Sequence, residues 1–114
     1  MRTQVGIVGA GPAGLMLSHL LHLAGIDSVI LEARSRAYCE GRVRAGLIEN
    51  WATDMLAETG VGERLQREGL VHNGINLSFG GALHHIDFKA LVGKIVTIYG
   101  QQEVVKDLIA KRLA

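Results

Sequence analysis

The residues best suited to chemistry are a glycine-rich turn, Gly9-Ala10-Gly11-Pro12-Ala13-Gly14, and the acidic residue Glu32. A Gly-x-Gly-x-x-Gly sequence that opens a helix lets the backbone approach a pyrophosphate, which the free N–H groups of the helix N-terminus then bind. An acidic residue at the end of the following strand accepts hydrogen bonds from ribose hydroxyls. Glu32 follows Gly14 by 18 residues. This spacing predicts a dinucleotide-binding site.

The elements that must position these residues can be identified on either side of the turn. Residues 4–8 form a short apolar run that predicts a buried strand, and Pro12 suits the first turn of a helix that ends before Gly25. Residues 28–32 are rich in aliphatic side chains and predict a second strand, parallel to the first. The face of the helix expected to point inward carries Leu17, Leu20, Leu21 and Ala24.

The rest of the chain predicts further helices and a β-hairpin. We expect a polar loop at 33–44, helices at 45–59, 63–68 and 102–113, paired strands at 75–79 and 83–88 around Gly80-Gly81, and a strand at 95–99. The expected fold class is α/β, with a Rossmann-like βαβ unit. Because a doubly wound sheet needs more strands than these, residues 1–114 are expected to form an incomplete domain, either as a fragment of a longer protein or with its missing layers supplied from elsewhere.

Composition narrows the possible partners and compartment. The net charge is +1 and there is no dense Lys/Arg block, so nucleic acid is not an expected partner. Cys39 is the single cysteine, which excludes an intrachain disulfide and favours a reduced, cytoplasmic setting. Glycines interrupt the apolar stretch near the N-terminus, so neither a signal peptide nor a membrane span is predicted. No third ligand accompanies the neighbouring His84 and His85, and no metal site is predicted.

Longer segments carry a resemblance to a known family. These are Thr-Gln-Val-Gly-Ile-Val-Gly-Ala-Gly-Pro at 3–12, Gly-Arg-Val-Arg-Ala-Gly at 41–46, Gly-Leu-Val-His at 69–72 and Val-Thr-Ile-Tyr-Gly-Gln at 96–101. Together they make the chain similar to the N-terminal part of the para-hydroxybenzoate hydroxylase family of FAD-dependent aromatic monooxygenases. The resemblance is nearly gapless and covers all 114 residues.

The resemblance implies that the dinucleotide is FAD, with Arg44 against the pyrophosphate. It implies that His72 ends a proton relay from the substrate phenol to solvent. By the same resemblance, Arg34 and Arg36 lie in the segment that selects the pyridine nucleotide in the family, and both NADPH and NADH remain open. The cofactor-binding residues that it implies, together with the glycine motif, are Gly9, Gly11, Pro12, Ala13, Gly14, Glu32, Ala33, Arg42, Val43, Arg44, Ala45, Gly46, Leu47 and Gln101.

The activity implied is hydroxylation of 4-hydroxybenzoate to protocatechuate (3,4-dihydroxybenzoate) with NAD(P)H and oxygen. The full-length form is expected to be a homodimer, and this stretch alone is expected to be inactive, because the relay tyrosines and substrate-binding residues of the family come later in its sequence. Two alternatives remain. One is a truncated, non-catalytic dinucleotide-binding module, and the other, from the glycine motif alone, is an NAD-dependent dehydrogenase.

Overall fold

The chain forms two compact units in the computed structural model, which describes residues 1–114. The first unit combines residues 1–45 with residues 100–114, and the second unit comprises residues 46–99. The helices and strands belong to the α/β class that the sequence predicts.

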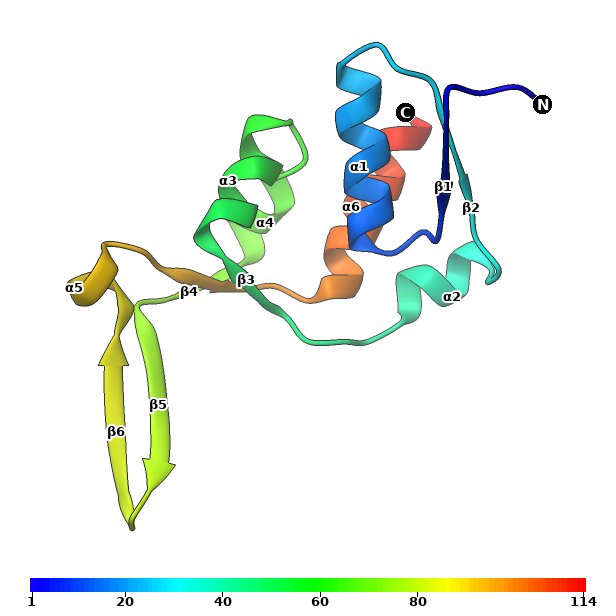
Figure 1. Ribbon diagram of the computed structural model, residues 1–114. Helices are drawn as coiled ribbons and strands as arrows, with labels where there is room; N and C mark the ends of the chain where they lie inside the picture. The colour runs from blue at the N-terminus through cyan, green and yellow to red at the C-terminus, as the bar shows by residue number, and fades with distance from the viewer. The chain divides into compact units, whose positions relative to one another are not determined.

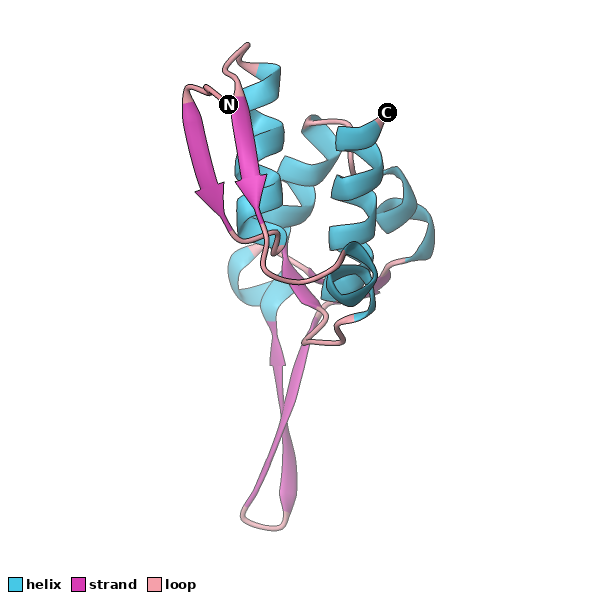
Figure 2. Cartoon of the chain, turned by 90° about the vertical axis from the view of Figure 1, so that its right-hand side faces the viewer, coloured by secondary structure: helices cyan, strands magenta, loops and turns pink.

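The first unit contains the βαβ motif. Strand β1 (Val5–Val8) leads through the glycine-rich turn into helix α1 (Pro12–Leu23), and strand β2 (Ser28–Leu31) returns beside β1. The two strands pair in parallel, with Val5 opposite Ser28 and Val8 opposite Leu31, and they lie side by side next to α1 in both ribbon views (Figure 1, Figure 2). The predicted order of strand, turn, helix and parallel strand is confirmed.

The buried face of α1 differs from the prediction. Leu15, Ser18 and His19 are buried, whereas Leu17 and Leu20 are 45% and 37% exposed. The helix contacts both β2 and α6 (Gln101–Leu113), and these two neighbours determine which side is covered. The Ser18 hydroxyl lies 3.0 Å from the hydroxyl of Ser28 on β2. The expectation that the leucines at 17 and 20 face inward was wrong, because apolar spacing identifies several possible stripes and the packing partners select one.

A short helix, α2 (Arg36–Gly41), replaces part of the predicted loop at 33–44. The Ser35 hydroxyl accepts a 3.2 Å hydrogen bond from the backbone N–H of Tyr38, as a helix N-cap does. Within the helix, Arg36 forms an i,i+4 ion pair with Glu40 at 2.7 Å. The loop prediction was wrong for these residues. The helix is stabilised by a polar N-cap and an ion pair, and it has no apolar stripe from which a helix could be predicted.

Helix α6 completes the core of the first unit. Val104, Val105 and Leu108 are buried, and Leu108 is fully enclosed. The helix packs against both α1 and α2, so residues from the far end of the chain lie beside the glycine-rich turn and its helix (Figure 1). No helix in the chain combines the length and apolar character needed to span a lipid bilayer.

The second unit is built on a three-stranded antiparallel sheet. Strand β7 (Val96–Ile98) lies between β3 (Leu47–Glu49) and β4 (Leu70–His72). Helices α3 (Asn50–Glu58) and α4 (Glu63–Glu68) separate β3 from β4 along the chain. The predicted helix at 45–59 was wrong at its start, because pairing with β7 holds 47–49 in an extended conformation.

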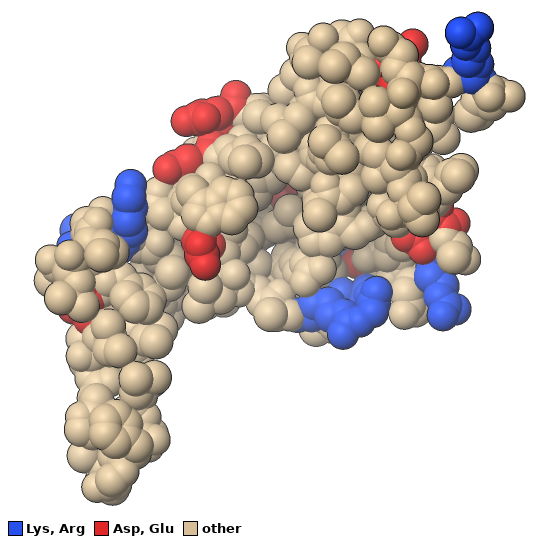
Figure 3. All heavy atoms as spheres, in the orientation of Figure 1, with Lys and Arg blue, Asp and Glu red and all other residues tan.

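The second unit also carries the predicted hairpin. Strands β5 (Gly74–Phe79) and β6 (Ala82–Asp87) pair across Gly80 and Gly81. Both glycines have positive φ, 60° and 73°, as a two-residue turn of type I′ requires. The hairpin surface carries almost no charge in the space-filling view (Figure 3). Helix α5 (Phe88–Val92) follows, capped by the carboxylate of Asp87.

Candidate dinucleotide-binding site

The three glycines of the turn meet different steric requirements. Gly9 has φ 105°, which L side chains rarely adopt. A Cβ at Gly14 would collide with the carbonyl oxygen of Gly9 and lie 3.2 Å from Cγ2 of Ile7. A Cβ at Gly11 would meet nothing within 4 Å. The first and third glycines are therefore needed by the fold itself, whereas Gly11 leaves open space where a ligand can approach the backbone.

Glu32 connects the end of β2 to the turn. Its Oε2 accepts a 2.8 Å hydrogen bond from the backbone N–H of Ala10, and its Oε1 accepts one of 2.8 Å from the backbone N–H of Arg34. These two hydrogen bonds hold the pKa of the Glu32 carboxyl below its ordinary value of 4.5, and the bond from Ala10 contributes most to this lowering. Since a carboxylate offers about four lone-pair sites, the ionised group retains acceptor capacity for ribose hydroxyls.

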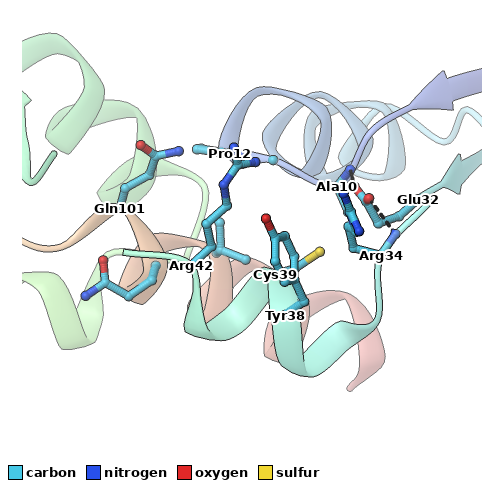
Figure 4. A pocket seen from close by; sticks show the side chains of 11 residues that line it. Ala10, Pro12, Glu32, Arg34, Tyr38, Cys39, Arg42 and Gln101 are labelled. Atoms are coloured by element: carbon cyan, nitrogen blue, oxygen red, sulfur yellow. Dashed lines mark hydrogen bonds between the residues drawn. The ribbon is translucent and has the colours of Figure 1, made fainter. Parts of the chain in front are cut away.

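A pocket of about 70 Å³ opens beside this carboxylate (Figure 4). This volume is far below that of a pocket enclosing a whole drug-sized ligand, so it can enclose only one part of a dinucleotide. The lining residues come from the turn, the end of β2, α2 and α6, and all belong to the first unit: Ala10, Gly11, Pro12, Glu32, Arg34, Tyr38, Cys39, Arg42, Gln101, Gln102 and Val105.

Two arginines give the pocket its positive charge. The Arg34 guanidinium carbon lies 5.3 Å from the centre of the Tyr38 ring, and that of Arg42 lies 5.9 Å from the same ring. Both distances fall within the range of cation–π attraction. Tyr38 and Arg42 lie four residues apart on α2 and its C-cap, so one helical turn places the ring and the second cation at the pocket (Figure 4). Paired cations of this kind suit a phosphate-bearing ligand.

The residues singled out from the sequence divide into three groups. The first group lines the pocket and comprises Gly11, Pro12, Glu32, Arg42 and Gln101. The second belongs to the same unit without lining the pocket and comprises Gly9, Ala13, Gly14, Ala33, Val43, Arg44 and Ala45. The third belongs to the second unit and comprises Gly46, Leu47 and His72.

Within the second unit, these three residues lie on or beside the sheet. The carbonyl of Gly46 accepts a 2.7 Å hydrogen bond from the backbone N–H of Tyr99. Leu47 begins β3 and lines a larger, mainly apolar cavity of about 450 Å³. His72 ends β4 opposite Val96 and is exposed. Pairing with β7 holds the chain extended at this residue.

Six pocket residues were not among the predicted FAD-binding residues: Ala10, Arg34, Tyr38, Cys39, Gln102 and Val105, of which Arg34 was named only for the pyridine nucleotide. The spacing of Gln101, Gln102 and Val105 places them on one face of α6. The sequence does not show which elements pack against that face, so these residues could not be assigned to the pocket from spacing alone. The spacing of Tyr38 and Arg42 would have been informative only with α2 recognised as a helix. No group of three or more His, Cys, Asp or Glu side chains is placed to hold a metal ion.

Comparison with known proteins extends these observations. The family model for the FAD binding domain matches residues 2–114. The chain is 48% identical over 113 residues to p-hydroxybenzoate hydroxylase of Acinetobacter baylyi, covering 98% of this chain and 28% of that protein. The chain thus spans little more than a quarter of that relative's length.

Solved structures share the fold. Anhydrotetracycline hydroxylase OxyS of Streptomyces rimosus is 28% identical with a TM-score of 0.80, and the match covers 99% of this chain and 23% of that one. PqsL of Pseudomonas aeruginosa, in complex with 2-aminobenzoylacetate, gives a TM-score of 0.85 at 20% identity, covering 96% of this chain and 30% of that one. At that identity the second likeness concerns the fold alone.

Proposed function

Since the chain belongs to the FAD-binding domain family, we propose that it is the cofactor-binding N-terminal part of a flavoprotein monooxygenase that hydroxylates 4-hydroxybenzoate to protocatechuate. The 48% identity to p-hydroxybenzoate hydroxylase supports this substrate and product. The observation that carries the proposal is the Glu32 carboxylate, bonded to Ala10 of the glycine-rich turn and lining the pocket beside it. An acceptor at a ribose position and a turn open to a pyrophosphate are the two requirements of a dinucleotide site.

The residues present fit the pyrophosphate and the adenosine ribose of an FAD molecule. The open space at Gly11 and the N-terminus of α1 suit the pyrophosphate, and Glu32 suits the adenosine ribose. Arg42 adds a permanent positive charge at the same pocket. Arg44 and Gln101 complete the proposed set, with Arg44 at the pyrophosphate and Gln101 at another part of the cofactor.

The protein's part in catalysis would be binding, orientation and proton control. When bound, FAD supplies the redox chemistry that connects a nicotinamide cofactor, oxygen and the aromatic ring. The electron donor would be NADPH or NADH. Arg34 and Arg36 are the candidate contacts for a 2′-phosphate. Arg36 is paired with Glu40 at 2.7 Å, so a phosphate would have to compete with that carboxylate.

His72 would serve as the outlet of the proton relay from the substrate phenol. An imidazole changes charge near neutral pH and can pass a proton in either direction, and His72 is exposed at the end of its strand. Replacing it with asparagine should slow turnover and shift its pH profile while leaving FAD affinity unchanged. Gly46 and Leu47 would lie along the flavin part of the site.

The decisive experiment is a visible absorption spectrum of the full-length protein after FAD reconstitution, recorded with and without 4-hydroxybenzoate. Flavin bands that change on adding 4-hydroxybenzoate, and NAD(P)H oxidation that it stimulates, are expected, with protocatechuate as the product. Comparison of NADPH with NADH in the same assay identifies the preferred donor. Absence of flavin bands would overturn the proposal.

A second candidate is a dinucleotide-binding module without catalysis. It is favoured by the fact that the pocket of the first unit is lined by residues suited to a dinucleotide. The intact mass of the native polypeptide and a turnover assay separate the two. For the hydroxylase, a cytoplasmic location and a homodimer complete the proposal, and sedimentation of the purified holoenzyme tests the dimer.

A further inference from the structure

Gln102 lies at the second position of α6, directly after the predicted cofactor residue Gln101, and lines the same pocket as Glu32. Its side-chain oxygen Oε1 is buried and has no hydrogen-bond partner. Burying an acceptor without a donor costs free energy. The protein itself therefore supplies no donor to this acceptor at the pocket.

Gly100 makes this arrangement possible. A Cβ at this position would lie 2.7 Å from Nε2, 2.8 Å from Oε1 and 2.9 Å from Cδ of Gln102. The amide group thus occupies the space that any other residue at 100 would need. Gly100 has φ −53° and ψ 137°, which alanine also adopts, so its backbone conformation does not require glycine. A Cβ here would instead have to displace the amide end of the flexible Gln102 side chain.

We propose that Gln102 is a further cofactor-binding residue whose side-chain carbonyl accepts a hydrogen bond from a sugar hydroxyl of the bound dinucleotide. This inference rests on the proposed function. A phosphate is excluded as the partner of this oxygen because both groups are acceptors. The sugar hydroxyls of FAD, on the adenosine ribose and on the ribityl chain, are donors that can pair with this oxygen. Pairing with one of them satisfies the side-chain oxygen, for which the protein itself supplies no donor.

The test uses the substitution Gln102→Met in the intact protein, with Gln66→Met on the exposed face of α4 as the matched control. Methionine keeps the length and helix propensity of glutamine and removes the buried oxygen. We expect the unbound Gln102→Met protein to melt at or above the wild-type temperature, and its FAD affinity to fall by about 3- to 10-fold. The Gln66→Met variant should match the wild type in both. A lowered melting temperature with unchanged affinity would indicate a structural role and overturn the proposal.

Shorter ligands identify the hydroxyl. An equal loss of affinity for ADP and FAD assigns the adenosine ribose, and a loss for FAD alone assigns the ribityl chain. Inosine diphosphate lacks the adenine amino group, so a loss seen with ADP must persist with it. Disappearance of the loss with inosine diphosphate would overturn the assignment to a sugar.

Gly100→Ala provides an independent variant, because the added Cβ displaces the amide while leaving glutamine in place. Its effect on FAD affinity should resemble that of Gln102→Met, and the double variant should lose no more than either single one. Fully additive losses would contradict the shared mechanism. If the wild-type protein itself fails to bind FAD, the proposed function falls together with this inference, whereas normal FAD binding by Gln102→Met overturns the inference alone.

Discussion

The backbone N–H of Ala10 donates a 2.8 Å hydrogen bond to the carboxylate of Glu32, 22 residues further along the chain. One residue thus fixes the conformation of the glycine-rich turn and offers an acceptor to the ligand beside it. The backbone N–H of Arg34 bonds the other carboxylate oxygen at 2.8 Å, so the side chain is held from both sides. The acidic residue of the motif is therefore part of the turn's architecture as well as the proposed ribose contact.

Glu32→Gln should damage both roles. The amide that replaces the carboxylate carries one NH₂ group, which must face the N–H of either Ala10 or Arg34, donor against donor, whichever way it turns. We expect FAD affinity to fall by roughly tenfold and the unfolding temperature to decrease. Flavin fluorescence titration and thermal melting measure the two effects. Glu63→Gln, at a side chain that is 94% exposed, is the control, and an equal effect there would contradict the prediction.

The ionisation of Glu32 should make stability depend on pH in acid. Its pKa is lowered in the folded protein, so the unfolded chain binds the proton more readily. The stabilisation is therefore present above the ordinary pKa of 4.5 and is lost as pH falls through the lower folded value. At pH 7 the wild type should have a higher free energy of unfolding than Glu32→Gln, and this difference should decrease as the pH falls below 4.5. A constant difference between the two proteins over that interval would show that ionisation of Glu32 is not the source.

Gly14→Ala should destabilise the fold before any ligand is present. Its Cβ would collide with the Gly9 carbonyl oxygen, and relieving the collision must move α1 away from the turn. Overpacking of this kind costs about 1–3 kcal/mol, which urea denaturation measures. Gly6→Ala in β1, where the added Cβ meets nothing within 4 Å, is the matched control. Equal stability of the Gly14→Ala and Gly6→Ala variants would refute the steric account.

Gly11→Ala should separate binding from folding. Its Cβ also meets nothing within 4 Å, and φ −78° with ψ 178° suits alanine. We expect the free energy of unfolding to change by less than about 1 kcal/mol and FAD affinity to fall at least tenfold, because the methyl group occupies the approach of the pyrophosphate. Isothermal titration with FAD and with ADP, which carries the same pyrophosphate, should report similar losses. Wild-type affinity in this variant would place the pyrophosphate elsewhere.

The sequence by itself determined the features that depend on local backbone chemistry. The glycine-rich turn, its flanking strands, helix 63–68 and the hairpin at Gly80 and Gly81 all have the predicted positions to within about two residues. Glycine permits the positive φ that a tight turn needs, and proline fixes φ in the first helical turn, whatever surrounds them. Glu32 could be singled out for the same reason, because its place after a strand follows from spacing along one short unit.

Tertiary structure decided which faces meet. The packing of α1 against β2 and α6 buried Ser18 and His19 in place of the leucines at 17 and 20, and pairing with β7 turned Leu47 from helix to strand. Tyr38 and Gln102 belong to the pocket only because α2 and α6 pack together beside the turn. A sequence pattern records the apolar character and conformational preference of each segment. The contact between segments far apart in the chain depends on burial and hydrogen bonding that exist only once both are folded.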